Sequence, residues 1–404
     1  MNMSNPLTGK RIIFGITGGI AAYKAADWLR SLRQAGAEVT VVMTEAATKF
    51  VTPMTFAALS GRPVECGIFD AARAEAIHHI SLAKECDLLL IAPATANTIA
   101  HLAHGMADTL LTAIVLATRA KVLVFPAMNS AMYLHPATQS NLEQLRRMDY
   151  TVIPPACGAM ACGDQGPGRL PDWPTAEAAI NSALTPQDLS NQHFLISAGP
   201  TQEPLDPVRF LSNRSTGKMG YALARAAQQR GAVVTLVSGP TALPPPIGVK
   251  TIQVRTALEM HQSILENYQD ATVIIKSAAV SDFRPSDPAP HKIKKGVADS
   301  SSLGLTANPD ILLELGEKKG HDARPLLIGF AAESDHHLQE GHRKLVKKNL
   351  NLMVVNDIMG SETGFGTDTN QITIIDRDGS QSPLPLLSKD ETAHRLLDRI
   401  IQLL

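Results

Sequence analysis

A cysteine stands at the head of a glycine-rich segment, "ACGDQGPGR" at 161–169. Cys157 and Cys162 have four residues between them and no second Cys or His pair nearby, so zinc binding is disfavoured. With Cys66 and Cys86, the chain has only four cysteines in 404 residues, which is not the pattern of a secreted disulfide framework. The segment therefore predicts a thiol, Cys162, carried on a flexible loop outside any metal or disulfide site.

A second chemical signal is the glycine loop "GITGGIAAYK" at 15–24, which lies between an apolar strand pattern and a helical pattern. Backbone amides at such a helix start bind phosphate, so Thr17, Gly18 and Gly19 are candidate ligands. A dinucleotide fold requires Asp or Glu after its second strand, and this chain has Thr44 there. FMN is therefore favoured over NAD; the alternatives are an NAD(P)-dependent oxidoreductase and a plain turn with glycines for packing.

Three further segments of the first half carry polar residues at expected strand or helix ends. "APATANTIAHLAHGMAD" (92–108), which contains Thr95, and "PAMNSAM" (126–132), which contains Asn129, each follow a strand pattern. Ligands of open α/β sheets bind beyond the carboxyl ends of the strands. "HHISL" (78–82) places two histidines before an amphipathic stretch. Together these segments favour a flavin site over a plain turn.

The second half has a long loop, "AGPTQEPLDPVRFLSNRSTGKMG" at 198–220, that leads into a helical pattern. It is not a Walker A loop, because Ser212 stands at the first glycine position and Met219 replaces Ser or Thr. The loop still offers amides and hydroxyls to an anion. The basic run "KIKK" at 292–295 is either a solvated face or a site for phosphate charge.

Alternating strands and helices position these segments. In the first half the patterns predict helices at 20–34, 105–118 and 138–148, and strands at 11–16, 38–43, 87–92, 121–125 and 151–153. The polar segment 185–192 is interpreted as a linker. The second half predicts helices from 220 and at 389–403, and strands at 193–197, 232–237, 272–276, 326–330, 352–355 and 371–376. Two doubly wound, Rossmann-like α/β domains follow, at 1–186 and 187–404.

Composition limits the partners and the compartment. The formal net charge is −1, with 44% hydrophobic and 19% charged residues, so bulk charge gives no reason to expect nucleic acid or an anionic membrane. No apolar run reaches membrane-spanning length, and the start of the sequence lacks the apolar segment of a signal peptide. The sequence therefore predicts a cytoplasmic protein that binds neither nucleic acid nor membrane.

Over nearly its whole length the chain resembles the bifunctional phosphopantothenoylcysteine decarboxylase/phosphopantothenate–cysteine ligase family of bacterial coenzyme A synthesis. The resemblance implies that the first domain is flavodoxin-like, of the cysteine decarboxylase type. It implies that His79 is the base, that Asn129 binds the substrate carboxylate and that Cys162 donates a proton. In the implied chemistry, FMN oxidises the cysteinyl thiol toward a thioaldehyde, CO2 leaves, and the resulting enethiol is protonated and reduced.

For the second domain the resemblance implies ligation of 4′-phosphopantothenate with cysteine through an acyl-cytidylate made from CTP, with Mg2+ shielding charge. Asn213 would hold this intermediate. The residues implied to contact the nucleotide are Lys276, Ser277, Ala278, Asp282, Lys292, Pro309, Asp310, Ile311, Phe330, Lys344 and Lys348. No metal ligand is assigned.

Three positions depart from the family pattern: Lys276, Phe283 and Ala307. They concern ligase contacts only and leave the decarboxylase residues untouched. The resemblance also implies a homo-oligomer, a dodecamer, with flavin sites at subunit contacts. The alternative readings are a flavoprotein with one active half and a non-catalytic regulatory relative.

Overall fold

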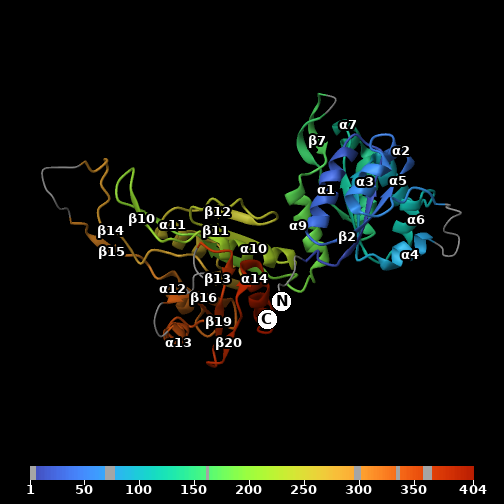
Figure 1. Ribbon diagram of the computed structural model, residues 1–404. Helices are drawn as coiled ribbons and strands as arrows, with labels where there is room; N and C mark the ends of the chain where they lie inside the picture. Colours follow the sequence, from blue (N-terminus) through green and yellow to red (C-terminus); the bar gives the residue numbers. More distant parts are fainter. Residues whose placement is uncertain (1–5, 69–77, 161–162, 295–301, 334–336, 358–365) are drawn as a thin grey trace. The chain divides into compact units, whose positions relative to one another are not determined.

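The structure is a computed structural model that describes residues 6–68, 78–160, 163–294, 302–333, 337–357 and 366–404. The chain forms two compact units that divide between Pro186 and Gln187 (Figure 1). Each unit is an α/β sheet covered by helices on both faces. In the described ranges, no helix combines the length and the apolar character needed to cross a bilayer.

The first unit is built on a five-stranded parallel sheet in the order β2-β1-β3-β4-β5. This is the flavodoxin-like order, in which the chain reverses direction across the sheet between β1 and β3. The strands are β1 (Arg11–Ile16), β2 (Glu38–Met43), β3 (Leu88–Ala94), β4 (Lys121–Pro126) and β5 (Thr151–Val152). A hairpin of β6 (Ala156–Ala159) and β7 (Gln165–Arg169) follows.

Side-chain alternation along β1 divides the first core into two layers. Ile12, Phe14 and Ile16 face α1 (Ala22–Gln34), α3 (Pro53–Ser60) and α9 (Trp173–Leu184). Ile13 faces the opposite layer, which contains α4 (His78–Glu85), α5 (Ala96–Ala103), α6 (Leu110–Ala117) and α8 (Pro136–Arg147). Two short helices, α2 (Glu45–Thr48) and α7 (Ser130–Leu134), follow β2 and β4. Burial of both faces explains why these strands read as continuous apolar runs.

The prediction of a single helix at 105–118 is wrong at its start. Gly105 has a φ of +66° and lies just beyond α5, which was not predicted. Helix α6 begins only at Leu110, where Thr109 and Thr112 form a capping box. The hydroxyls of these threonines satisfy the first free amides of α6, so local hydrogen bonding sets the boundary more sharply than the apolar pattern does.

The second unit has an eight-stranded sheet in the order β12-β11-β8-β13-β16-β17-β19-β20. The first six strands in this order, β12 through β17, are parallel and follow the dinucleotide-fold order 3-2-1-4-5-6. Strands β19 and β20 add antiparallel strands at one edge. Their bounds are β8 (His193–Ala198), β11 (Val233–Ser238), β12 (Lys250–Gln253), β13 (Val273–Lys276), β16 (Leu326–Glu333), β17 (Leu352–Asp357), β19 (Ile372–Asp376) and β20 (Gln381–Pro383).

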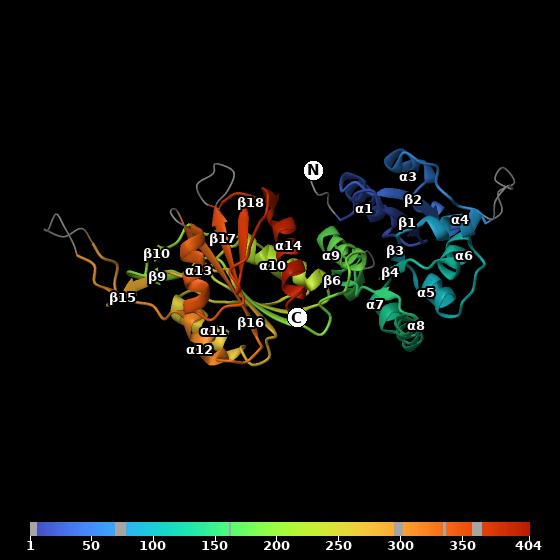
Figure 2. The same ribbon diagram turned by 90° about the horizontal axis from the view of Figure 1, so that it is seen from below.

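Five helices cover this sheet. Helices α10 (Lys218–Gln229) and α14 (Lys389–Ile401) pack on the face of Phe194 and Ile196. Helices α11 (Ala257–Glu266), α12 (Ile311–Lys319) and α13 (His337–Lys347) lie along the face of Leu195 (Figure 2). Short strand pairs decorate the loops: β9 (Gln202–Pro204) with β10 (Phe210–Ser212), β14 (Phe283–Pro285) with β15 (Leu305–Ala307), and β18 (Thr369–Asn370) with β21 (Leu387–Ser388).

The interpretation of 185–192 as a linker needs correction, because its second part belongs to the core of the second unit. Leu189 is completely buried there. Asp188 pairs with Arg230 at 2.7 Å, and Arg230 also reaches Asp398 of α14 at 2.7 Å. The hydrogen bond from Arg230 holds the pKa of Asp188 below its usual range. The polar composition of this segment did not reveal that Leu189 is buried or that Asp188 pairs with a buried arginine.

Arg230→Leu is expected to lower the free energy of unfolding of the second unit by about 1–2 kcal/mol. The guanidinium is 7% exposed, but its partners Asp188 and Asp398 are 37% and 51% exposed, so water can solvate them once it is lost. Urea denaturation of the full chain measures the change. Arg225→Leu, which removes a surface pair with Asp390 whose side chains are 44% and 62% exposed, is the matched control and should cost less than about 0.5 kcal/mol.

Candidate active sites

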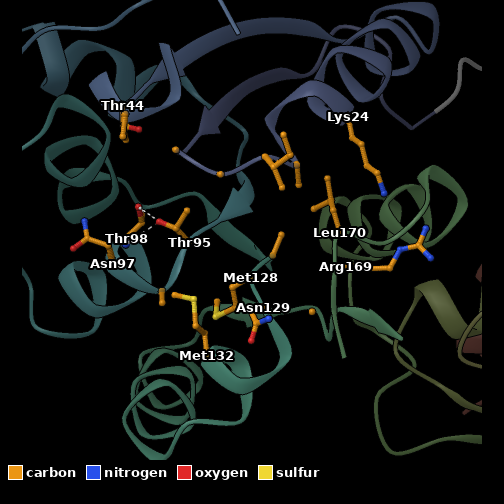
Figure 3. A pocket seen from close by; sticks show the side chains of 18 of the residues that line it. Lys24, Thr44, Thr95, Asn97, Thr98, Met128, Asn129, Met132, Arg169 and Leu170 are labelled. Atoms are coloured by element: carbon orange, nitrogen blue, oxygen red, sulfur yellow. Dashed lines mark hydrogen bonds between the residues drawn. The ribbon is translucent and has the colours of Figure 1, made fainter. Parts of the chain in front are cut away.

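A cavity of about 1080 Å³ lies in the first unit at the carboxyl ends of the strands (Figure 3). The loops after β1 and β3 both line it, through Gly18 and Gly19 and through Thr95 to Thr98. These two strands are neighbours from which the chain continues in opposite directions, which is where ligands bind in open α/β sheets. The sheet order thus brings together segments that are about 75 residues apart in sequence.

The predicted phosphate cradle is assembled on one wall of this cavity. Gly18, Gly19, Thr44 and Thr95 all line it. Thr44 Oγ1 accepts a hydrogen bond from Ala47 N at 3.3 Å, and Thr95 Oγ1 accepts one from Thr98 N at 3.3 Å, so each threonine caps a helix. A Cβ at Gly18 would lie 2.4 Å from Ala46 Cβ, so only glycine lets the loop approach α2. Hydroxyls and helix-start amides are the donors that suit a phosphate monoester.

Thr17 was predicted in the same cradle, but it does not line the cavity. Its side chain is buried, and its hydroxyl donates to Pro93 O at 2.6 Å while accepting from Thr95 N at 3.0 Å. These two bonds tie the loop after β1 to the loop after β3. Thr17 therefore positions the loops after β1 and β3, and its role as a cofactor ligand stays a prediction.

Asn129 follows β4 and lines the same cavity. Its Oδ1 accepts a hydrogen bond from Ala131 N at 2.8 Å, which caps α7, and its Nδ2 donates to Asp164 Oδ2 at 2.7 Å. The Asn129 amide therefore binds the carboxylate of Asp164, and it could donate the same hydrogen bond to the carboxylate of a ligand. Cys162 lies outside the described residues.

His79 lies in the first turn of α4 and is not among the residues that line the cavity. Its neighbour His78 contacts Glu65, with Nε2 3.0 Å from Oε2. The structure of a single chain therefore does not bring the predicted base to Asn129.

The cavity wall also contains Lys24, Arg169, His101 and Asp108, which were not predicted. Lys24 and Arg169 lie within the quoted segments, as the last residue of "GITGGIAAYK" and of "ACGDQGPGR". His101 and Asp108 lie on α5 and on the loop that follows it, with Nδ1 2.9 Å from Oδ1, and this hydrogen bond lowers the pKa of Asp108. Lys24 and Arg169 could have been found because each is a basic residue at the end of a quoted motif. No local sequence pattern indicated the pairing of His101 with Asp108.

In the second unit a cavity of about 160 Å³ lies at the corresponding reversal, between β8 and β13. Of the predicted residues, Ser277, Ala278 and Phe330 line it. Ser277 Oγ donates to Ser197 O at 2.9 Å, and Ala279 N donates to Gly199 O at 2.9 Å, which anchors the loop after β13 to the loop after β8. The amino end of α10 closes the cavity with Gly217 and Lys218.

The predicted charged residues form a cluster around Lys276 at the end of β13. Lys348 Nζ lies 2.8 Å from Asp310 Oδ2, and Asp310 caps α12 by accepting from Leu313 N at 3.1 Å. Burial lowers the pKa of Lys276 to about 8; the Lys348 charge adds to this effect, whereas Asp310 and Asp282 oppose it. Although burial works against it, the bond from Lys348 holds the pKa of Asp310 below its usual range. Two cations and two carboxylates thus converge here.

The other predicted positions border this cluster. Pro309 and Ile311 flank Asp310, and Lys344 precedes Lys348 by one turn, with Lys348 N donating to Lys344 O at 3.0 Å. The Asn213 amide donates to Ala279 O at 3.0 Å, which places it against the loop after β13. Lys292 is exposed and lines neither cavity.

The segment that carries Lys292 is tied to the buried carboxylate of Asp206. Asp206 accepts from Ile293 N at 3.1 Å and from Arg209 Nη2 at 2.6 Å, and Arg209 in turn donates to Ile293 O at 2.6 Å. Despite burial, these hydrogen bonds hold the pKa of Asp206 well below its usual range. Lys292 is thereby connected to the long loop after β8.

Sequence reasoning missed several polar residues that line the small cavity together with Ser277. Asn356, Asn370 and Lys389 line the small cavity with Lys218. Neither Asn356 Oδ1 nor Asn370 Oδ1 has a hydrogen-bond partner in the part of the chain that the structure describes. Buried polar atoms of this kind are normally satisfied, so a bound ligand or water is the expected partner. Asn356 directly follows the predicted strand at 352–355, which was the available signal.

Two family models match the chain, one on each unit. Residues 1–185 match the family described as "Flavoprotein", and residues 189–404 match "DNA/pantothenate metabolism flavoprotein C-terminal domain". The chain therefore consists of a flavoprotein unit followed by a C-terminal domain of the DNA/pantothenate metabolism flavoprotein type.

Curated relatives extend over both units. The "Coenzyme A biosynthesis bifunctional protein CoaBC" of Vibrio cholerae is 46% identical over 98% of each chain, and that of Escherichia coli is 45% identical over 98% of this chain and 97% of its own. A solved C-terminal domain of a protein with the same name is 44% identical, covers 53% of this chain and 98% of its own, and has a TM-score of 0.45. The chain belongs to this family of bifunctional coenzyme A biosynthesis proteins. It is accordingly an enzyme with a decarboxylase half and a ligase half.

Proposed function

We propose that the second unit joins 4′-phosphopantothenate to cysteine at the expense of CTP, and that the first unit decarboxylates the resulting 4′-phosphopantothenoylcysteine with FMN. The observation that carries this proposal is the pairing of two different sites in one chain. The first offers a hydroxyl-lined cradle and the amide of Asn129, and the second offers the cluster of Lys276, Asp310 and Lys348. A flavin phosphate and a substrate carboxylate suit the first site, and a nucleotide triphosphate suits the second.

In the first unit, Gly18, Gly19, Thr44 and Thr95 would hold the FMN phosphate, and FMN would supply the two-electron oxidation and its reversal. Asn129 would receive the substrate carboxylate in place of Asp164, because an amide that donates to one carboxylate at 2.7 Å can donate to another. Cys162, outside the described residues, is proposed as the proton donor.

His79 is proposed as the base of a neighbouring copy, since it is absent from the cavity wall of its own chain. Apolar side chains that reach the surface near this cavity support such an assembly, with Ile20 61% exposed and Met132 50% exposed. We propose that the oligomer is a dodecamer. The proposed compartment is the cytoplasm. Sedimentation measures the oligomeric state, and a stable monomer with full decarboxylase activity would contradict this role of His79.

In the second unit, the carboxylate of 4′-phosphopantothenate would attack the α-phosphate of CTP, and the amine of cysteine would then open the acyl-cytidylate. Asn213, bonded to the loop after β13, would hold the intermediate, and the lysines would stabilise phosphate charge. The described residues contain no group of three potential metal ligands. Mg2+ is commonly held by substrate phosphates and one or two carboxylates, so we propose that it enters with CTP.

The affinity for CTP is expected to fall as the pH rises through about 8. Lys276 is protonated below that pH and attracts the triphosphate, and above it the charge is lost while the carboxylates of Asp282 and Asp310 remain. Calorimetric titration of CTP from pH 6.5 to 9.5 measures the effect. Lys276→Met should bind CTP more weakly and lose this inflection; an unchanged profile would separate Lys276 from the nucleotide.

Mass spectrometry of the products from 4′-phosphopantothenate, cysteine, CTP and Mg2+ tests the whole proposal with the purified chain. Phosphopantetheine would require both sites to work. Phosphopantothenoylcysteine alone would indicate a working ligase and a flavin-free or inactive first unit, which added FMN distinguishes. Absence of any product would contradict the ligase assignment, and phosphopantothenoylcysteine supplied directly then tests the first unit by itself.

A further inference from the structure

Two cations, Lys24 and Arg169, lie at one end of the flavin-unit cavity. Lys24 is in the first turn of α1 and is partly buried, and Arg169 ends β7. Figure 3 shows both side chains at the end of the cavity that lies opposite Thr44 and Thr95, where the phosphate cradle is. The cavity therefore has two separate groups of residues that could bind an anion, and the proposed FMN phosphate would use only one of them.

Among the described residues, no hydrogen bond or ion pair engages the Lys24 ammonium or the Arg169 guanidinium. A partly buried lysine normally has a partner, so an anionic ligand is the natural complement. The Arg169 guanidinium lies beside Gly158, where a Cβ would be 2.6 Å from its Nη1. Gly158 leaves room for the guanidinium to lie across the β6–β7 hairpin.

The two cations stand where the first cavity meets a second one. A neighbouring cavity of about 750 Å³ shares Tyr23, Lys24, Arg169 and Leu170 with the first. Its remaining wall includes Asp27 and Asp172, whose charges disfavour an anion deeper inside. A phosphate group would therefore be held at the junction, by an ammonium and a planar guanidinium that can form two parallel hydrogen bonds to it.

The junction lies beside the residue proposed to bind the substrate carboxylate. Met128 N donates to Gly168 O at 3.0 Å, so Asn129 and Arg169 are the next residues along two hydrogen-bonded segments. The substrate proposed above has a carboxylate at one end and a phosphate monoester at the other end of a neutral arm. We propose that Lys24 and Arg169 bind this phosphate and make the decarboxylase half select phosphorylated over dephosphorylated pantothenoylcysteine. The inference rests on the proposed decarboxylation.

Lys24→Gln, Arg169→Gln and the double variant, each in the full chain, test the inference. We expect wild type to prefer the phosphorylated substrate in kcat/KM, and each substitution to reduce this preference by about 10-fold to 100-fold, which is the usual effect of one hydrogen bond to a charged group. Arg30→Gln, an exposed residue on the same helix, is the matched control and should leave the preference intact.

Two outcomes would overturn the inference. The first is an unchanged preference in the double variant. The second is loss of bound flavin from that variant, measured by its absorption band, because the cations would then hold the cofactor phosphate instead. If wild type releases no CO2 from either substrate, the proposed decarboxylation is wrong. The phosphate site is then tested by binding alone, with 4′-phosphopantetheine and pantetheine titrated against the flavin absorption band. Tighter binding of the phosphorylated compound by wild type alone supports the site, and equal affinity overturns it.

Discussion

Asn129→Asp is expected to reduce CO2 release from 4′-phosphopantothenoylcysteine by about 10²–10³-fold while the protein remains folded and flavin-loaded. The substitution removes the Nδ2 donor that lies 2.7 Å from Asp164. It also adds a negative charge where the substrate carboxylate is proposed to bind, beside a carboxylate already present. Aspartate caps a helix as well as asparagine does, so the bond from Ala131 N that begins α7 is retained.

The measurement is CO2 release together with the flavin absorption of the same preparation. Ligation should continue in the variant, so phosphopantothenoylcysteine should accumulate from the three ligase substrates. Asn141→Asp, the same change on α8 away from the cavity, is the matched control. A loss of less than a few fold in Asn129→Asp would remove this amide from carboxylate binding.

Lys348→Ala is expected to reduce kcat/KM of the ligase half by about 10²–10³-fold, the usual cost of removing one group that stabilises developing charge. The ammonium lies 2.8 Å from Asp310, and its charge reaches Lys276. Without it, one of the two cations that face the proposed triphosphate is missing. The pKa of Lys276 should also rise, because a neighbouring like charge that lowers it has been removed.

Pyrophosphate release with CTP, 4′-phosphopantothenate and cysteine measures the first effect, and the pH dependence of CTP affinity measures the second. The inflection near pH 8 should move to higher pH in the variant. Lys347→Ala, at an exposed neighbouring position on α13, is the matched control, and decarboxylation in the first unit is the internal one. If both lysine variants lose activity equally, Lys348 has no special place in the ligase site.

The sequence by itself determined the elements and the chemistry of the loops between them. Apolar runs bounded by glycine and polar clusters predicted β1 to β5 and the main parallel strands of the second sheet, because strands buried on both faces must be apolar throughout. Gly18, Gly19, Thr44, Thr95 and Asn129 were identified because each follows a strand, and strand ends are where such folds bind ligands. The sequence showed the apolar periodicity of α6 more clearly than the capping residue Thr109, so the start of this helix was predicted wrongly.

Tertiary structure decided which of these residues meet and which only support the others. Thr17 has a hydroxyl and lies in the loop after β1, as a phosphate ligand would, yet this hydroxyl donates to Pro93 O and accepts from Thr95 N. The small cavity at α10 recruits Asn356 and Asn370 from strands distant in sequence. Lys24 and Arg169 share one wall only because the β6–β7 hairpin returns to α1. Such contacts arise from strand order and loop packing, which residue patterns along the chain do not encode locally.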